Sequence, residues 1–263
     1  EQMTWRDVKD AMDSGKKTVI VPIGSMEQHG PHLPEGTDTF TGDVLGERIA
    51  RKLGDALVAP TIRPGCSGHH MRFPGTITLS AETLMRTIRE VCSSLAFHGF
   101  ENIVLMPTHG GNFAAVNAVA PEIARKLDAN IVVLADLEAM RETMVKSLEG
   151  FGVSPAQAGV HSGAAETSFA LASFEELVEK DLMQAGYIGE FTNSTLMKEI
   201  GALSPIGVIG DPRKASKEAG ERVVNDLVEA YALKIALGTQ RKPKRKAQRI
   251  QGSSKSAAEV PKR

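Results

Sequence analysis

Residues 18–34 read TVIVPIGSMEQHGPHLP and join an apolar run, Thr18–Gly24, to a polar cluster. The run has no polar alternation, which is typical of a strand buried on both faces of a parallel sheet. Three later runs have the same character: Ala56–Ile62, Asn102–Pro107 and Asn130–Ala135. The sequence therefore predicts at least four buried strands.

Helical patterns separate these strands. They cover Phe40–Leu53, Ser80–Phe97 and Phe113–Leu127, the last of which Pro121 should bend or divide. After the fourth strand, the chain reads as helix to about Leu148, enters another helix near His161–Ser168, and is helical again over Arg213–Leu237. Strands that alternate with helices predict an α/β fold with a parallel sheet covered on both faces.

Composition and charge narrow the class of protein. The 263 residues are 41% hydrophobic, enough for a large single core. The net charge of −1 combines a basic segment after Gly238, of net charge +8, with an acidic remainder of −9. We expect a folded domain over 1–238 that does not bind nucleic acid, and a mobile basic tail over 239–263. The tail is a solvated extension or, as the less favoured alternative, a contact for RNA or another acidic surface.

Cellular location is inferred from what the chain lacks. Only two cysteines occur, Cys66 and Cys92, without the spacing of a disulfide scaffold. We find no basic-then-apolar leader and no apolar run of membrane-spanning length. These features predict a cytoplasmic protein without a membrane partner.

A cluster of potential metal ligands follows the first strand. Glu27 and His29 are two residues apart, so an extended backbone directs both side chains the same way, and Asp38 returns from the following loop. Carboxylate oxygens with neutral imidazoles suit zinc or manganese. The alternative is a solvated polar loop. A dehydrogenase is disfavoured because this loop lacks G-x-G-x-x-G.

Two more polar segments follow the second and third strands. They are Gly65–His70 and Thr108–Asn112. Because ligands of such sheets bind beyond the carboxyl ends of the strands, we expect all three segments at one edge. His109 is then either part of a tight turn or a metal ligand. An extended backbone would let only one of His69 and His70 reach the site.

Three other residues have two interpretations each. Glu166 is a helix-capping acid or a carboxylate ligand, and His161 is a surface residue or a proton shuttle. Cys66 fits a packed residue better than a nucleophile, since a cysteine mechanism would leave the carboxylates without a role.

Several motifs together resemble the creatininase (creatinine amidohydrolase) family. They are Gly24–Pro34, Thr37-Asp38, His109-Gly110-Gly111-Asn112, Glu166-Thr167-Ser168 and Gly207–Pro212, in order over roughly residues 1 to 237. The resemblance implies a three-layer α/β/α sandwich with a mostly parallel central sheet. It also implies a small-molecule substrate, a homohexamer, and two divalent metal ions per chain, which are zinc or, as alternatives, manganese or iron.

The resemblance also implies roles for individual residues. Glu27, His29, Asp38 and His109 match metal ligands, with Asp38 as the bridge. Glu166 matches a carboxylate at the same centre, and His161 matches a proton-transfer residue. We assign catalysis to His161 and Glu166. Substrate binding is assigned to His70, Gly110, Gly111 and Asn112, with the glycine N–H groups holding an oxyanion.

Two departures argue against creatinine as the substrate. Creatinine-hydrolysing members have His-x-Glu-Asn where this chain has His109-Gly110-Gly111-Asn112, so Glu166 must compensate or the second metal is weakly held. The only tryptophan is Trp5, whereas those members cover the substrate ring with later tryptophans.

The predicted function is hydrolysis of a non-peptide C–N bond, in an amide, cyclic amide or formamide, by metal-activated water. Alternatives are a hydrolase of the same family acting on a sugar-derived lactone, a diketone or a peptide bond, and a non-catalytic metal- or ligand-binding protein.

Overall fold

A four-stranded parallel sheet forms the centre of the computed structural model, which describes residues 1–189 and 199–239. The strand order is β2-β1-β3-β4, with β1 at Thr18–Ile23, β2 at Ala56–Val58, β3 at Asn102–Pro107 and β4 at Asn130–Val133. Thr18 is paired with both Ala56 and Asn102, and Asn102 is paired with Asn130. Because the strands start in line and run the same way, the segments that follow them leave from one edge.

Each face of the sheet contributes to a separate hydrophobic core. Ile20 of β1 and Val104 of β3 belong to one core, whereas their neighbours Val21 and Ile103 belong to the other. Successive side chains of a strand point to opposite faces, so a strand covered on both sides must be apolar throughout. This requirement explains the unbroken apolar runs.

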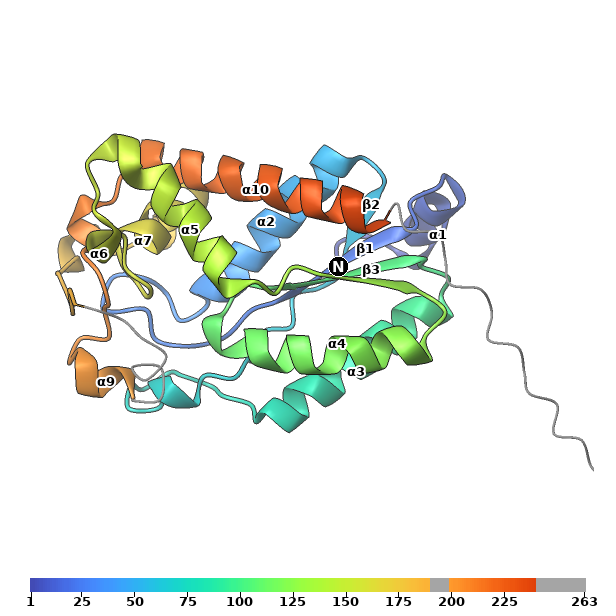
Figure 1. Ribbon diagram of the computed structural model, residues 1–263, viewed down its shortest axis with the longest axis horizontal. Helices are drawn as coiled ribbons and strands as arrows, with labels where there is room; N and C mark the ends of the chain where they lie inside the picture. The colour runs from blue at the N-terminus through green and yellow to red at the C-terminus, as the bar shows by residue number, and fades with distance from the viewer. Residues whose placement is uncertain (190–198, 240–263) are drawn as a thin grey trace, which may run out of the picture.

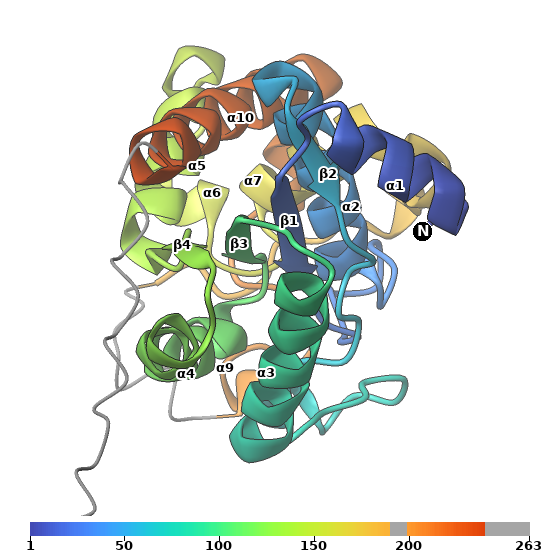
Figure 2. The ribbon, with the colours of Figure 1, turned by 90° about the vertical axis from the view of Figure 1, so that its right-hand side faces the viewer.

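Helices cover both faces (Figure 1). Figure 2 shows α3 and α4 on one side of the strands, and α2, α5, α7 and α10 on the other. The helices are α1 (Trp5–Asp13), α2 (Thr37–Leu53), α3 (Ala81–Phe97), α4 (Phe113–Lys126), α5 (Leu137–Leu148), α6 (Pro155–Ala158), α7 (Ala164–Ser173), α9 (Ile200–Leu203) and α10 (Lys217–Thr239). The predicted three-layer α/β/α sandwich with a parallel sheet is confirmed.

Several element boundaries differ from the prediction. Helix α2 begins at Thr37 rather than Phe40, so Asp38 lies in the first helical turn and not in a loop. Strand β2 ends at Val58, two residues before Pro60, which has no N–H to donate to the ladder. Helix α4 continues through Pro121 without dividing.

The structure describes only part of the C-terminal region for which a helix and a basic tail were predicted. Helix α10 starts at Lys217, after a 3-10 turn at Pro212–Lys214, and ends at Thr239. The rest of the predicted basic tail, 240–263, lies outside the described residues. Within the described ranges, no helix combines the length and apolarity needed to cross a bilayer.

Candidate metal centre

Glu27 and His29 reach the carboxyl edge of the sheet on the segment after β1. Both are almost fully buried. The backbone N–H of Glu27 donates to the Glu35 carbonyl, and Nδ1 of His29 lies 3.0 Å from the Glu27 carbonyl. Because that oxygen can only accept, Nδ1 carries the ring proton and Nε2 is left to face the site.

Three more side chains meet this pair from other elements. Asp38 comes from the first turn of α2, His109 from the end of β3, and Glu166 from the first turn of α7. His109 Nδ1 lies 3.1 Å from Glu27 Oε2 and 3.2 Å from Asp38 Oδ2. We call Glu27, His29, Asp38, His109 and Glu166 the candidate centre.

His29 contacts Asp38 as well, together with Glu166. Its Nε2 lies 3.6 Å from Asp38 Oδ1 and 3.9 Å from Glu166 Oε2. Asp38 therefore directs one oxygen to each imidazole, His29 and His109. A carboxylate between two sets of ligands is the arrangement of a metal-bridging residue.

The ligand atoms form groups of the size that a divalent cation requires. Glu27, Asp38 and His109 form one group, and His29, Asp38 and Glu166 form another, with the atoms of each group within 4.8 Å of one another. Glu27, His29 and His161 form a third. Asp38 is shared by the first two, so the described residues form two candidate ligand groups with one carboxylate in common.

Buried ligand atoms without a well-formed hydrogen bond indicate whether these residues suit a metal ion. Glu27 Oε2, His29 Nε2 and Asp38 Oδ2 are buried, and none of them makes a well-formed hydrogen bond within the described part of the chain; the two carboxylate oxygens share the single His109 Nδ1 as a near neighbour. Such atoms are rare in folded proteins, because an unpaired buried polar group is costly. All three converge on the space that the two groups enclose, so the donor set fits divalent cations.

The protonation equilibria of the centre support the same conclusion. Burial disfavours the charged imidazole, yet the neighbouring carboxylates, Asp38 above all, raise the pKa of His29 to about 10. Burial is also outweighed at His109, where Glu27 and Asp38 raise the pKa well above its usual range. The carboxylates thus draw positive charge into a buried site, which a bound cation would supply.

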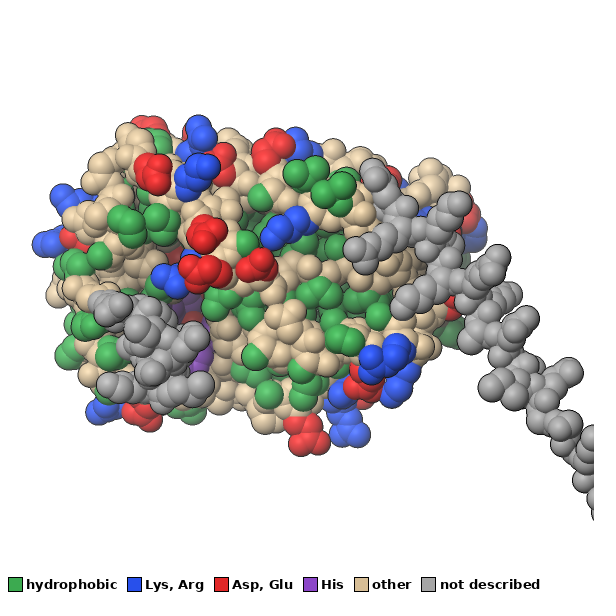
Figure 3. All heavy atoms as spheres, viewed as in Figure 1, with side chains coloured by type: hydrophobic (Ala, Val, Ile, Leu, Met, Phe, Trp, Pro, Cys, Tyr) green, Lys and Arg blue, Asp and Glu red, His purple; other side chains and the backbone are tan. Residues whose placement is uncertain are grey.

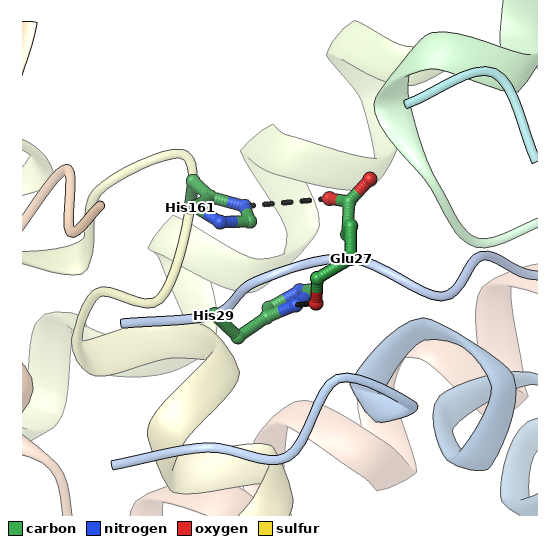
Figure 4. Close-up of side chains that lie close together, drawn as sticks. All are labelled: Glu27, His29 and His161. Atoms are coloured by element: carbon green, nitrogen blue, oxygen red, sulfur yellow. Dashed lines mark hydrogen bonds and ion pairs between the residues drawn. The ribbon is translucent and has the colours of Figure 1, made fainter. Parts of the chain in front are cut away.

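His161 lies beside the centre, with Nδ1 3.8 Å from Glu27 Oε1 (Figure 4). Its Nε2 lies 2.8 Å from the Gln28 carbonyl. Because a carbonyl only accepts, Nε2 carries the proton and Nδ1 turns a lone pair toward Glu27. Burial, with the His29 ring beside it, lowers the pKa of His161 to about 3. His161 is therefore a neutral imidazole whose Nδ1 faces the centre.

Gln28 connects two histidines of the site, although its place in the motif after β1 predicts no role for it. Its Nε2 lies 2.8 Å from His70 Nδ1, 2.9 Å from His161 Nε2 and 3.2 Å from the Gly207 carbonyl. The Gln28 side-chain amide donates its two protons to His70 Nδ1 and to the Gly207 carbonyl. The Nε2 proton of His161 is donated to the backbone carbonyl of Gln28. The Nε2 proton of His70 then points at Glu27 Oε1, 3.3 Å away.

The loop at Gly68–His70 forms a 3-10 turn, not an extended segment. Both His69 and His70 consequently line the pocket, where an extended backbone would have let only one reach it. The His69 ring stacks on His109 with centroids 5.6 Å apart. Burial raises the pKa of the pocket residue Cys66, which disfavours a thiolate nucleophile.

The His109-Gly110-Gly111-Asn112 segment divides between pocket and scaffold. Gly110 and Gly111 line the pocket, whereas Asn112 is fully buried. The Asn112 amide donates to the Ile23 and Gly24 carbonyls and accepts from the Cys66 N–H. The structure thus brings His70 and both glycines to the pocket, but uses Asn112 to join three loops.

A pocket of about 770 Å³ opens over the candidate centre. Figure 3 shows histidine side chains at the bottom of an opening flanked by charged residues. Helix α5 forms another wall, to which it contributes Leu137, Glu138, Met140, Arg141, Met144 and Val145. No motif in the sequence marks this wall, because its residues follow an ordinary amphipathic pattern.

A family model described as "Creatininase: Creatinine amidohydrolase" matches residues 1–235. The chain belongs to the creatininase family. The match covers the whole sandwich and every residue of the candidate centre, so the resemblance noted in the sequence is confirmed.

Relatives within the creatininase family are hydrolases. The mycofactocin precursor peptide peptidase of Mycobacterium ulcerans is 31% identical over 235 residues, 84% of this chain and 86% of that protein. The creatinine amidohydrolase of Pseudomonas putida is 28% identical over 246 residues, 88% and 93% of the two chains. The chain is accordingly a hydrolase of this family.

Solved structures agree with the fold and with a metal site. One titled "Creatininase Mn" superposes with a TM-score of 0.75 at 26% identity, covering 91% of this chain and 98% of that one. A glutamate-to-glutamine mutant creatininase of "Zn-Zn type" also has a TM-score of 0.75 at 26% identity, covering 91% and 97%. Creatininase-family structures thus carry zinc or manganese, and this chain has residue groups suited to such ions.

Proposed function

We propose that this protein is a metal-dependent amidohydrolase that cleaves a non-peptide C–N bond of a small molecule with the help of two divalent ions. The observation that carries the proposal is the position of Asp38 between two ligand groups. Glu27, Asp38 and His109 would hold one ion, and His29, Asp38 and Glu166 the other. Zinc is the first candidate, with manganese or iron as alternatives.

Glu166 is the carboxylate that would replace the acidic ligand missing at position 111. A side chain at position 111 has no room, because a Cβ there would lie 2.1 Å from the Cys66 carbonyl and 2.6 Å from His109 Nε2. Glu166 supplies a carboxylate from α7 instead, held by the Ser162 N–H at 2.5 Å. Burial raises the pKa of Glu166 to about 7, which also suits a proton-transfer role near neutral pH.

Divalent ions in such a centre lower the pKa of water and polarise a substrate carbonyl. His161 would take a proton from the attacking water at Nδ1, the nitrogen that faces Glu27, and would pass it to the leaving nitrogen. The hydrogen bond from Nε2 to the Gln28 carbonyl fixes the tautomer that this transfer requires. Gly110 and Gly111 leave the backbone open beside the centre, where N–H groups can hold developing negative charge.

The proposal is tested by replacing Asp38 with Asn in the full chain. The variant should lose metal at both sites and should have no measurable amidase activity, since one carboxylate serves both groups. Elemental analysis after reconstitution measures the metal, and Asp10→Asn on the exposed face of α1 is the control. Two ions per chain and full activity in Asp38→Asn would rule out the bridging role.

Peptide-bond cleavage is the second candidate function. It is favoured by the 31% identity to a peptide peptidase and by a pocket with an open volume of about 770 Å³. Formamides, cyclic amides, short peptides and sugar lactones offered to metal-loaded protein distinguish the candidates. Binding of metal without turnover of any of them would instead indicate a non-catalytic binding protein.

We also propose that the protein assembles as a homohexamer in the cytoplasm, following the family resemblance. Light scattering coupled to size-exclusion chromatography tests the assembly, and a mass of one or two chains would refute it.

A further inference from the structure

Helix α5 shares the walls of two pockets with residues of the candidate centre. Met140 and Met144 line the large pocket and also a small cavity bordered by Asp38 and Glu166. The next residue after Met140 is Arg141, which lines the large pocket too. Arg141 is therefore within one helical turn of side chains that border the centre.

Arg141 has unused hydrogen-bonding capacity. Its Nε is buried and has no acceptor in the described ranges, 1–189 and 199–239. Arg141 forms an ion pair with Glu138, in which Nη1 lies 3.5 Å from Oε2. The Glu138 side chain is 71% exposed. A guanidinium has five N–H donors in a planar fork, so most of this fork remains available.

Charge distinguishes Arg141 from the rest of the pocket. It is the only Lys or Arg among the described pocket-lining residues. Apolar side chains of the same helix, Met140, Met144 and Val145, line the pocket beside it. A ligand that satisfies this wall carries both apolar surface and an anion.

We infer that Arg141 binds an anionic group of the substrate and thereby sets its class: an amide that carries an apolar group and, close to it, a carboxylate or phosphate. This inference rests on the proposed amidohydrolase function. The planar fork of Arg141 matches two oxygens of such an anion at once. The anion would replace the Glu138 carboxylate as the partner of Arg141, and the Glu138 side chain would turn to solvent.

The test uses full-length, metal-loaded protein and a matched pair of probes that differ only in charge. N-acetyl-L-leucine should bind about 10- to 100-fold more tightly than N-acetyl-L-leucinamide, as measured by calorimetry, because it adds charge-assisted hydrogen bonds. Arg141→Met should abolish this preference. Arg51→Met, an exposed position on α2, should leave it unchanged.

The phosphonate analogue of N-acetyl-L-leucine separates the two anion sources. A stronger effect of Arg141→Met on the phosphonate assigns the site to phosphate, and a stronger effect on the acid assigns it to carboxylate. Glu138→Gln should strengthen binding of the preferred anion a few-fold, because it removes a competing carboxylate. Each of these outcomes supports an anion site at Arg141.

Two results would overturn the inference. One is a preference for the anion that survives in Arg141→Met, since the anion would then bind the metal ions or another surface. The other is no measurable binding of either anion by the metal-loaded wild type. Because binding is read without turnover, failure of the amidase proposal is seen separately, as absence of hydrolysis in a protein whose anion preference still depends on Arg141.

Discussion

Replacing His70 with Ala should weaken zinc binding although His70 is not a member of the two ligand groups that share Asp38. His70 lies between Gln28, at 2.8 Å, and Glu27 Oε1, at 3.3 Å, and both contacts are buried. Its Nε2–H holds one oxygen of Glu27 so that the other, Oε2, faces His109 and the ion. Without this donor, the Glu27 carboxylate is free to rotate and loses a buried partner.

The magnitude follows from the contact that is lost. A hydrogen bond to a charged group contributes about 1.5–3 kcal/mol, and 3.3 Å favours the lower part of that range. Partners that orient metal ligands typically contribute about 10- to 100-fold to metal affinity. We therefore expect the zinc Kd of His70→Ala to rise about tenfold or somewhat more.

A chelator competition titration measures the Kd, and two variants serve as comparisons. His70→Gln places an amide N–H near the position of Nε2 and should recover most of the lost affinity. His98→Ala removes an exposed ring at the end of α3 and should bind zinc as the wild type does. A Kd of His70→Ala within twofold of the wild type, in a folded protein, would refute the orienting role.

Three further predictions concern proton transfer, pH and packing. His161→Ala should lower kcat by about 10²–10⁴ with metal content unchanged, as elemental analysis and steady-state kinetics would show; loss of metal would make His161 a ligand instead. Zinc binding should release protons and weaken as the pH falls, because raised pKa values keep His29 (about 10) and His109 protonated in the metal-free protein, whereas ligation needs neutral rings. Calorimetry in two buffers of different ionisation enthalpy measures this release, and identical heats would contradict it. Gly111→Ala should lower the free energy of unfolding by about 1–3 kcal/mol, because the new Cβ would lie 2.1 Å from the Cys66 carbonyl oxygen. The control is Gly110→Ala, whose Cβ would meet nothing within 4 Å and which should leave the stability unchanged. Equal thermal denaturation midpoints for the two variants would contradict this prediction.

Most of the fold is predictable from local pattern. The run Thr18–Gly24 is apolar on both faces because β1 lies between two cores, and the same reason applies to Asn102–Pro107. Boundaries were less predictable. Helix α2 begins at Thr37 after Gly36, which offers no side-chain cap, so the sequence carries no start signal there.

The central residues of the site were predictable for a topological reason. Glu27 and His109 follow strands that are neighbours in the sheet, and parallel strands bring their carboxyl ends to one edge. Glu166 and His161 were found through the family resemblance, and the fold carries them to the same edge on α7 and the loop before it. Their roles in catalysis remain proposals that the variants above test.

The contacts made by other residues of the site have no signal in the sequence. Gln28 touches His161, 133 positions away, and His70, 42 positions away, and neither separation corresponds to a local periodicity. Arg141 lies in a helix with ordinary amphipathic spacing. His69 reaches the pocket because a 3-10 turn replaces the extended backbone that adjacent histidines suggested.

The sequence by itself determined the layers of the fold, the supply of carboxylates and imidazoles, and the edge of the sheet where they gather, since these depend on side-chain chemistry and short-range period. Only the tertiary structure decided which side-chain atoms of the site contact one another. The tautomers of His70 and His161, the sharing of Asp38 and the position of Arg141 on the pocket wall all depend on distances across the chain. Such distances are set by how helices pack on the sheet, and packing joins residues that no local pattern relates.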